Sequence, residues 1–514
     1  MTWKNEIKEL EERKNLAKEL GGQDKIERQH KNNRYTIRER ISIFFDKNSF
    51  REFGILAGES KYDNEILESF IPSNSVIGHG LINDRTIAFY GDDFTVRGGA
   101  ADASIWQKII AAEQLANEYE IPLVRFIEGT GGGGSVKSIE KQGFTYVPFN
   151  PGWDKVVENL SKIPVISLAL GPVAGLGAAR LVSSHYSIML KKNSQVFVAG
   201  PPLVEKIGEK VSKEELGGSN IHGTNGVVDE VAENEIEAME MAKKFLTYVP
   251  DSIHDLPKRI KPEDNVTRKD QFLLKIIPKN KRESYDILPI INSVVDKNSL
   301  FEIGRKYGLS VITGFARLNG FPIVVIANNP QVYGGGWTSD SSKKIIKIID
   351  LAQVFHFPVL NFVDNPGFII GKNAEKDGTI KYGAKALAAI YQFKNPMCSI
   401  ILRKVFGVAG AAHTNHTKFK FRFAWPSADT GSLPFEGGIE AAYKAEINNS
   451  SNPEAFIKEK YKKLNRVTSP FRSAEKFLLE NIIDPRDTRE EVCTWIKLAY
   501  KSLKVGPSFF GYRP

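Results

Sequence analysis

Two stretches of the chain share the same order of apolar and small residues. One is Pro164–Arg180, PVISLALGPVAGLGAAR, and the other is Pro396–Ala412, PMCSIILRKVFGVAGAA, which lies 232 positions later (396 − 164). Each begins with an apolar run bounded by turn residues, which predicts a buried strand. Each then passes through a turn of small residues into an Ala-rich stretch, which predicts the start of a helix.

Such strand–turn–helix units expose backbone N–H groups, because the first N–H groups of a helix have no partner within it and the dipole favours negative charge there. Gly175-Leu176 and Gly407-Val408 occupy the two turns. Two anion-stabilising turns suggest two oxyanion holes, one in each half of the protein. The alternative is two unrelated strand–helix units, which are common in α/β proteins.

A longer match between the halves indicates an internal duplication. Lys108-Ile109-Ile110 aligns with Lys344-Ile345-Ile346 at an offset of 236 positions (344 − 108). Leu115-Ala116, Pro122, Gly98-Gly99 and Gly131 align with Leu351-Ala352, Pro358, Gly334-Gly335 and Gly367 at the same offset. Ordered matches over about forty residues predict two homologous α/β domains. We place them at residues 1–250 and 285–514, joined by a Pro-rich, charged linker over residues 251–284 that runs along the surface.

Local patterns predict the elements around these segments. Residues 1–45 have a charged helical pattern that breaks at Gly21-Gly22, and Asn83-Asp84 predicts a hairpin turn within residues 76–90. A helix over Ile105–Tyr119 followed by a buried strand over Pro122–Ile127 predicts a βαβ-like unit.

The candidate chemistry after this strand is ambiguous. The loop Gly129–Gly134, GTGGGG, lacks the Lys-Ser/Thr of a phosphate loop, so we expect its glycines to allow close approach of a ligand or of another backbone segment.

Glu128 and Asp364 are equivalent carboxylates at strand ends. Either could be a general base or a helix cap, with capping favoured for Asp364. His413 and His416 lack metal-ligand spacing and are expected at the surface or against a partner.

Composition narrows the class of protein. The 514 residues include two cysteines, which disfavours a disulfide framework and a Cys-rich zinc site. The basic residues behind the net charge of +9 are dispersed, which disfavours nucleic-acid binding but is compatible with a phosphate-bearing partner such as coenzyme A. No signal peptide and no bilayer-spanning run are visible, so the cytoplasm is the expected location.

Several motifs, taken in order, extend over nearly the whole chain. They are RERI (38–41), GDDFTVRGG (91–99), LGPVAGLGAA (170–179), EELGGSNIHGTNGVVDEVAENEIEA (214–238), GFARLNGFPIVVIANNP (314–330), VDNPGF (363–368), YGAKALAAI (382–390) and IIDPRDTR (482–489). In this combination the chain resembles the carboxyltransferase (β) subunits of biotin-dependent acyl-CoA carboxylases. The resemblance implies an α/β fold of two duplicated crotonase-like (ββα-spiral) domains.

The resemblance also implies a reaction and its site. The carboxyl group moves from N1-carboxybiotin to the α (or vinylogous) carbon of an acyl-CoA through an enolate, and the freed biotin takes the α-proton. The backbone N–H pairs that hold the carbonyls map onto Gly175 and Leu176 and onto Val408 and Ala409. The substrate-binding positions that we expect are Gly131, Gly132, Gly407 and Ala411.

The implied cofactor is biotin, carried covalently by a partner subunit (a biotin carboxylase or biotin carboxyl carrier, α, subunit), with acyl-CoA as substrate and no metal. A homo-oligomer, commonly a ring of six, is also implied, with neither nucleic acid nor membrane as partner. The chain departs from propionyl-type members at EGTGGGGS (128–135) in place of DSGGAR, and at GVAGA (407–411) in place of GGAYD. The acyl group is therefore open, and a bulkier or branched one is possible. Two alternatives are a decarboxylase subunit and a non-catalytic homologue that binds a biotin-bearing partner.

Overall fold

A computed structural model describes residues 2–100, 105–129, 131, 136, 139–140, 143–145, 147–465 and 467–514. The chain divides into two compact units, Met1–Asp255 and Leu256–Pro514. The expected linker residues 251–284 do not lie only on the surface, because Leu273 is buried in the apolar core of the second unit.

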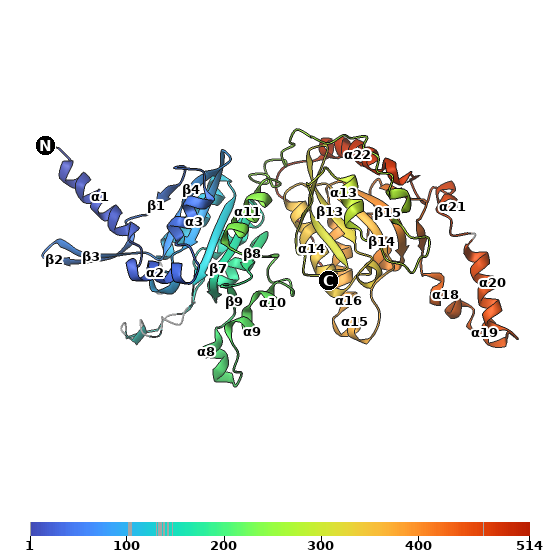
Figure 1. Cartoon of the computed structure of the whole chain (residues 1–514), viewed down its shortest axis with the longest axis horizontal. Coiled ribbons are helices and arrows are strands. Elements are labelled where there is room, and N and C mark those ends of the chain that lie inside the picture. The colour runs from blue at the N-terminus through green and yellow to red at the C-terminus, as the bar shows by residue number, and fades with distance from the viewer. Residues whose placement is uncertain are drawn as a thin grey trace. The chain divides into compact units, whose positions relative to one another are not determined.

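The first unit contains a sheet and its covering helices (Figure 1). Its elements are α1 (Lys4–Lys18), α2 (Gln23–Lys31), α3 (Ile37–Phe44), β1 (Arg51–Phe53), β2 (Gly58–Asp63), β3 (Ile66–Pro72), β4 (Ser75–Ile82), β5 (Arg85–Asp92), η1 (Arg97–Gly99), α4 (Trp106–Tyr119), β6 (Leu123–Gly129), α6 (Trp153–Asn159), β7 (Val165–Ala174), α7 (Leu176–Val182), β8 (Tyr186–Leu190), β9 (Gln195–Phe197), α8 (Pro201–Val204), η4 (Glu205–Ile207), α9 (Lys213–Gly217), α10 (Ser219–His222), β10 (Glu230–Ala232) and α11 (Glu235–Leu246).

The second unit repeats the strand order of the large sheet. Its elements are α12 (Leu273–Ile276), α13 (Leu288–Val294), β11 (Phe301–Glu302), β12 (Val311–Leu318), β13 (Phe321–Asn328), η5 (Tyr333–Gly335), α14 (Ser339–Val354), β14 (Val359–Asn365), α15 (Lys372–Lys376), α16 (Thr379–Gln392), β15 (Met397–Phe406), α17 (Gly407–Ala411), β16 (Phe421–Ala424), β17 (Asp429–Gly431), α18 (Phe435–Ala442), α19 (Lys444–Asn449), α20 (Pro453–Asn465), α21 (Pro470–Glu475), β18 (Asn481–Ile482), η6 (Pro485–Asp487) and α22 (Thr488–Ser502).

The two sheets have the same topology. The first has the order β1-β4-β5-β6-β7-β8-β10 with β9 beside β7, and the second has the order β11-β12-β13-β14-β15-β16-β18 with β17 beside β15. In each, the first three strands pair antiparallel and the later ones pair in parallel. The duplication predicted from the matches at an offset of 236 is therefore confirmed as two similar α/β sheets.

The local predictions around β4–β6 are also confirmed. Asn83 and Asp84 form the two-residue turn between β4 and β5, and their φ angles of 49° and 62° are those of a hairpin turn. The expected helix is α4, and the expected strand is β6, which pairs in parallel with β5. The N-terminal segment forms three helices, with Gly22 preceding α2.

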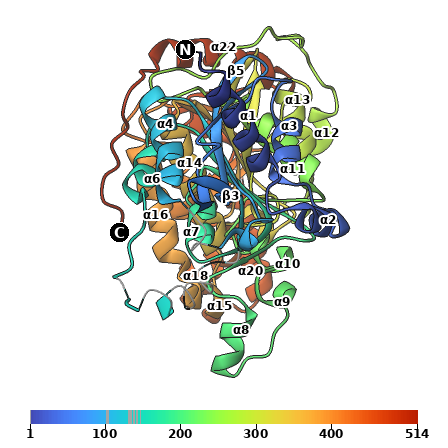
Figure 2. The ribbon, with the colours of Figure 1, turned by 90° about the vertical axis from the view of Figure 1, so that its left-hand side faces the viewer.

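The sheet of the first unit has two different faces. Figure 2 shows α4 and α6 on one side of the strands and α3 and α11 on the other. Phe44 of α3 packs edge-to-face on Phe126 of β6, whereas Ile109 and Ala112 of α4 pack with Tyr90 of β5. Because successive strand side chains point to opposite faces, Tyr90 and Asp92 face α4, while Glu128 faces α3 together with Phe126.

Candidate active site

The first of the two predicted turns joins β7 to α7. Gly175 has φ 60° and ψ −124°, a conformation that residues with a side chain rarely adopt, and an added Cβ would meet open space. The Gly175 N–H donates to the Phe197 carbonyl at 3.3 Å. The Leu176 N–H is the first of α7 and has no partner within the helix, because Ala179 is the first residue to donate back, to the Gly175 carbonyl. Leu176 is therefore the freer donor of the expected pair.

The second turn joins β15 to α17 in the same way. Gly407 has φ 62°, and Val408, which follows it, has a side chain that is 57% exposed. The amides of Gly407, Val408 and Ala409 are the first three of α17, so they too lack partners within the helix. Ala409 itself is fully buried, so Val408 presents the more accessible amide.

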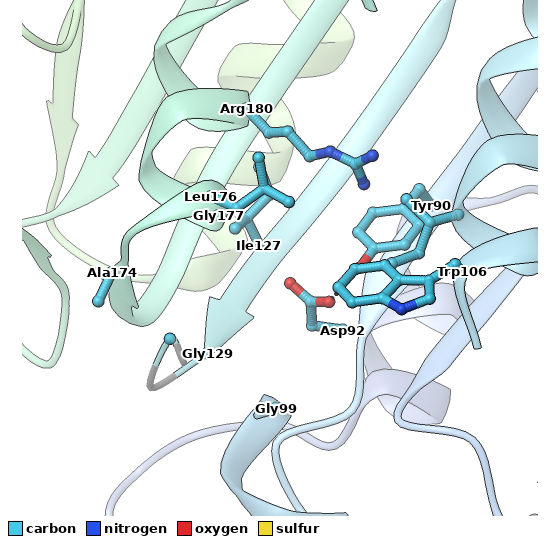
Figure 3. A pocket seen from close by; sticks show the side chains of 12 residues that line it. Tyr90, Asp92, Gly99, Trp106, Ile127, Gly129, Ala174, Leu176, Gly177 and Arg180 are labelled. Carbon is cyan, nitrogen blue, oxygen red and sulfur yellow. Dashed lines mark hydrogen bonds between the residues drawn. The ribbon is translucent and has the colours of Figure 1, made fainter. Parts of the chain in front are cut away.

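A cavity of about 250 Å³ opens beneath the first turn. Among the described residues its lining comprises Tyr90, Asp92, Gly99, Trp106, Ile109, Ile127, Gly129, Gly131, Ala174, Leu176, Gly177 and Arg180 (Figure 3). The structure therefore brings Gly131 and Leu176 to one cavity. Gly131 lies against the end of β7, because a Cβ there would come within 3.2 Å of Ala174 Cβ. Gly132 lies outside the described residues.

The glycines at the strand ends allow close backbone contact. A Cβ on Gly99 would lie 2.3 Å from the Glu128 carbonyl oxygen, and a Cβ on Gly129 would lie 2.7 Å from the Gly99 carbonyl oxygen. Gly129 thus shows the close approach that its sequence suggested.

Asp92 and Arg180 are charged residues of this cavity that sequence reasoning did not select. The Tyr90 hydroxyl donates to Asp92 Oδ1, and the Glu128 N–H donates to Oδ2 at 3.0 Å. Burial raises the pKa of Asp92 to about 7, with the Glu128 carboxylate adding to the effect. The one available signal for Arg180 was a single basic residue within the otherwise apolar sequence LGAARLV.

Glu128 is not placed to act as a base in this cavity. Its carboxylate is fully buried on the α3 side of the sheet and pairs with Arg34 and Arg40, with N–O distances of 2.7 Å for both. Arg40 also pairs with Glu235 at 2.7 Å. Glu128 therefore joins the sheet to α3 and caps no helix.

The expectation that Asp364 caps a helix was wrong. Asp364 is fully buried and accepts hydrogen bonds from Tyr285 Oη at 2.9 Å, Arg403 Nε at 3.1 Å and the Lys404 N–H at 2.9 Å. The carboxylate therefore anchors neighbouring segments of the second unit, as Glu128 does in the first.

The second cavity, of about 170 Å³, lies at the turn of the second unit. Gly407 and Ala411 line it together with His413 and His416, so the structure brings these two expected substrate-binding positions together. The surface expectation for His413 was wrong: the side-chain amides of Asn361 and Asn365 lie 2.8 Å and 2.9 Å from its two ring nitrogens, and burial lowers its pKa to about 3. His413 is thus a neutral, buried residue, whereas His416 is exposed.

Within the described part of the chain, no group of three His, Cys, Asp or Glu side chains is arranged to hold a metal ion. The helices of that part include none with the length and apolar character needed to cross a bilayer.

In each of the duplicated sheets, one strand (β7 or β15) ends in a turn that presents backbone amides beside a cavity. This arrangement defines a two-domain crotonase-like α/β protein. The model of the carboxyl transferase domain family matches residues 28–508, and the chain belongs to this family. The family resemblance predicted from the motifs is therefore confirmed, and the protein is an enzyme of the carboxyltransferase-subunit type found in biotin-dependent acyl-CoA carboxylases.

Individual relatives match over almost their full length. The chain is 31% identical over 494 residues to the propionyl-CoA carboxylase beta chain of Cereibacter sphaeroides, covering 95% of each chain. It is 29% identical over 522 residues to the methylmalonyl-CoA decarboxylase subunit alpha of Veillonella parvula, covering 100% of this chain and 99% of the relative. The crystal structure of transcarboxylase 12S, a hexamer with methylmalonyl-CoA and methylmalonic acid bound, matches with a TM-score of 0.90 and 26% identity, covering 100% of this chain and 99% of the other.

Proposed function

We propose that the two turns hold the carbonyl oxygens of the two reacting groups, biotin and an acyl-CoA thioester, while the carboxyl group moves from biotin N1 to the α-carbon of the thioester. The amide of Leu176, which follows Gly175, would face the thioester oxygen of an acyl-CoA, and the amides of Val408 and Ala409 would face the carbonyl of biotin. The observation that carries this proposal is the geometry common to both turns: a glycine with φ near 60°, then amides without a partner in the helix, beside a cavity.

The chemistry of the first turn follows from where charge develops. Removing the α-proton of a thioester places negative charge on its oxygen, and a preorganised amide donor is worth about 3 kcal/mol of transition-state stabilisation. Leu176 carries most of this role, because the Gly175 N–H already has the Phe197 carbonyl as partner. The role of Gly175 is then to set the backbone angle that aims the Leu176 N–H.

The second turn can donate to a carbonyl oxygen. The Val408 amide has no partner in the helix, and a Cβ added to Gly407 would have only the Ser432 carbonyl within 4 Å, at 3.5 Å. Biotin, when bound on its partner subunit, supplies the carboxyl group. The part of this chain is to hold and polarise the carbonyl through Val408 and Ala409.

A proline substitution tests the first turn. Leu176→Pro deletes the N–H at the first helical position, where proline is tolerated because that N–H makes no helical bond. We expect carboxyl transfer to fall about 100- to 1,000-fold, the cost of losing one oxyanion donor. Leu176→Ala is the matched control, because it trims the side chain and keeps the amide. Activity is followed as labelled carboxyl transfer to acyl-CoA with the biotinylated partner present.

Val408→Pro repeats the test at the second turn, with Val408→Ala as its control. Each proline variant is compared with wild type by circular dichroism and thermal melting. Near wild-type transfer by a folded Leu176→Pro variant would contradict the assignment.

The direction of the reaction rests on the relatives. The similarity to propionyl-CoA carboxylase subunits of several organisms supports carboxylation as the function of this chain. The similarity to the methylmalonyl-CoA decarboxylase subunit of Veillonella parvula supports decarboxylation as a second candidate. We propose carboxylation, with the biotin-bearing subunit of a carboxylase as partner. Co-purification with a biotin carboxylase and ATP-dependent carboxylation of acyl-CoA is the expected result; biotin-dependent decarboxylation alone would support the second candidate.

We also propose a homo-oligomer, on the basis of the hexamer assembly in the transcarboxylase 12S structure. Light scattering of the purified chain is expected to give six times the chain mass, and a monomer at micromolar concentration would contradict this.

A further inference from the structure

Arg180 is a buried cation of the first cavity without a carboxylate partner. Its side chain is buried, and Nη2 donates to the Pro151 carbonyl at 2.8 Å. Its Nε has no hydrogen-bond partner, and no carboxylate of the described residues lies within ion-pair distance of the guanidinium. Because burying a charge without a counterion is costly, such an arrangement favours an anion in the cavity.

The neighbouring Arg125 shows what a satisfied arginine looks like in the same unit. Arg125 donates from Nε and Nη2 to the Glu113 carboxylate at 2.9 Å and 2.8 Å, and from Nη1 to the Ser183 carbonyl at 2.9 Å. Glu113 is thereby committed to Arg125. The ion pair of Glu113 is with Arg125 and does not extend to Arg180.

The guanidinium of Arg180 points into the cavity. Figure 3 shows the side chain extending from α7 across the cavity toward the Tyr90 ring. The distance from Cζ to the ring centroid is 6.0 Å, at the outer limit of a cation–π contact. Tyr90 therefore leaves most of the positive charge available to a ligand.

Arg180 is also placed at a suitable distance from the proposed thioester site. It lies four residues beyond Leu176 on α7, which is about one helical turn or roughly 6 Å along the axis. The wall of the cavity that Leu176 and Arg180 both line also includes the apolar side chains of Trp106, Ile109 and Ile127. An acyl chain whose carbonyl is held at Leu176 can therefore run along this wall toward the guanidinium.

The fold itself does not require an arginine here. The equivalent position in the second unit, 232 residues later, is Ala412, which is buried after α17. Asp92, the carboxylate of the same cavity, already accepts from the Tyr90 hydroxyl and the Glu128 N–H. Arg180 thus has neither a structural counterpart in the sister unit nor Asp92 as an ion-pair partner.

We infer that Arg180 is a specificity-determining residue that binds a carboxylate carried by the acyl group of the CoA thioester. This inference rests on the proposed function, because it takes the thioester to be held at Leu176. Two sources of the carboxylate share this chemistry. One is the group on the α-carbon, which the reaction transfers, and the other is a second carboxylate at the far end of a dicarboxylic acyl chain.

The test measures binding of three CoA thioesters to the full chain by calorimetry. Malonyl-CoA carries the carboxylate on the α-carbon, glutaryl-CoA carries it at the chain end, and butyryl-CoA carries none. We expect wild type to bind at least one of the two carboxylate-bearing thioesters more than tenfold tighter than butyryl-CoA. Arg180→Gln should remove this preference and leave the affinity for butyryl-CoA within threefold. Arg180→Lys should retain part of it, because the charge remains.

Lys192→Gln is the control for loss of a positive charge, because Lys192 is exposed and does not line the cavity. A preference for malonyl-CoA that depends on Arg180 identifies the transferred carboxylate, and one for glutaryl-CoA identifies a dicarboxylic substrate. Equal binding of all three thioesters by wild type overturns the inference even if no Arg180 variant folds. Failure of wild type to bind any of the three would instead contradict the proposed function.

Discussion

The two units use the same backbone devices at corresponding positions. The Glu128 N–H donates to the Asp92 side chain at 3.0 Å, and the Asp364 N–H donates to the Asn328 side chain at 3.2 Å. Lys108 Nζ donates to the Ser75 carbonyl at 2.6 Å, as Lys344 Nζ does to the Val311 carbonyl at 2.7 Å. All four pairs of equivalent positions keep the offset of 236 found in the sequence. The framework that ends in the two turns has therefore been kept in both copies.

The side chains around the turns differ between the copies. The first cavity contains Asp92 and Arg180, and Arg180 forms no ion pair with a carboxylate of the described residues. The second contains the neutral, buried His413 and Arg422, whose guanidinium is paired with the Glu480 carboxylate at 2.8 Å. An arginine without a carboxylate partner suits an anionic ligand, whereas an arginine already paired with a carboxylate leaves its cavity suited to an uncharged one, because buried charges need counterions. The comparison teaches that one backbone scaffold can present amides to two different ligands, with the side chains deciding which ligand each cavity accepts.

The largest difference between the two units is expected in the loss of stability when the buried carboxylate of each unit, Glu128 or Asp364, is replaced. Glu128→Gln leaves the buried Arg40 and the half-buried Arg34 without that partner, so we expect a loss of stability of about 3–5 kcal/mol, typical of breaking a buried ion pair. Asp364→Asn leaves one arginine, Arg403, without its carboxylate partner, so the loss of stability should be smaller. Thermal melting of both variants measures the difference.

The exposed pair Lys191–Glu233 provides the control, because Glu233→Gln should change the melting temperature little. A Glu128→Gln variant that melts like wild type but has lost all activity would instead restore Glu128 as a general base.

A smaller effect is expected when pH changes the affinity of the first cavity for carboxylate-bearing thioesters. Since the pKa of Asp92 is raised to about 7, its carboxyl is neutral below that pH and ionised above it. The groups that influence its charge are Tyr90 and Arg180 on the same side of the sheet, the Glu128 N–H, and the Glu128 carboxylate on the opposite side. An ionised Asp92 would repel a ligand carboxylate and attract the Arg180 charge. Affinity for the preferred carboxylate-bearing thioester should therefore fall as the pH rises from 6 to 8, by roughly tenfold, the equivalent of one pKa unit.

Asp92→Asn should abolish this pH dependence, because the amide does not titrate, and butyryl-CoA should show none in either protein. An unchanged pH profile in Asp92→Asn would assign the titration to another group.

The smallest effect is expected at the second cavity. Ala411→Asp places a carboxylate at an exposed position beside His416 on the cavity wall. We expect it to change the ratio of turnover among acetyl-, propionyl- and butyryl-CoA by a few-fold while total turnover stays similar. A carboxylation assay against this panel measures the ratio, with Ala411→Ser as the uncharged control. An identical profile in Ala411→Asp would exclude this position from chain-length selection.

The sequence by itself determined the duplication, the order of elements and the two turns. These depend on short-range rules: Asn83-Asp84 adopts positive φ and turns the chain, and glycine at positions 175 and 407 does the same before a helix. The repeated apolar runs fixed the matching strands, because a buried parallel strand needs an uninterrupted apolar sequence.

Only the tertiary structure decided which side chains meet. Glu128 ends a strand whose neighbours along the chain suggest a site, yet its partners Arg34 and Arg40 lie 94 and 88 residues away and draw it to the other face of the sheet. His413 is buried by Asn361 and Asn365, 52 and 48 residues away, although its local sequence looks polar. Arg180 has no carboxylate partner because, in the folded chain, Glu113 pairs with Arg125 and Asp92 accepts hydrogen bonds from Tyr90 and the Glu128 N–H. Side-chain partnerships of this kind depend on long-range packing, which periodicity and local motifs do not encode.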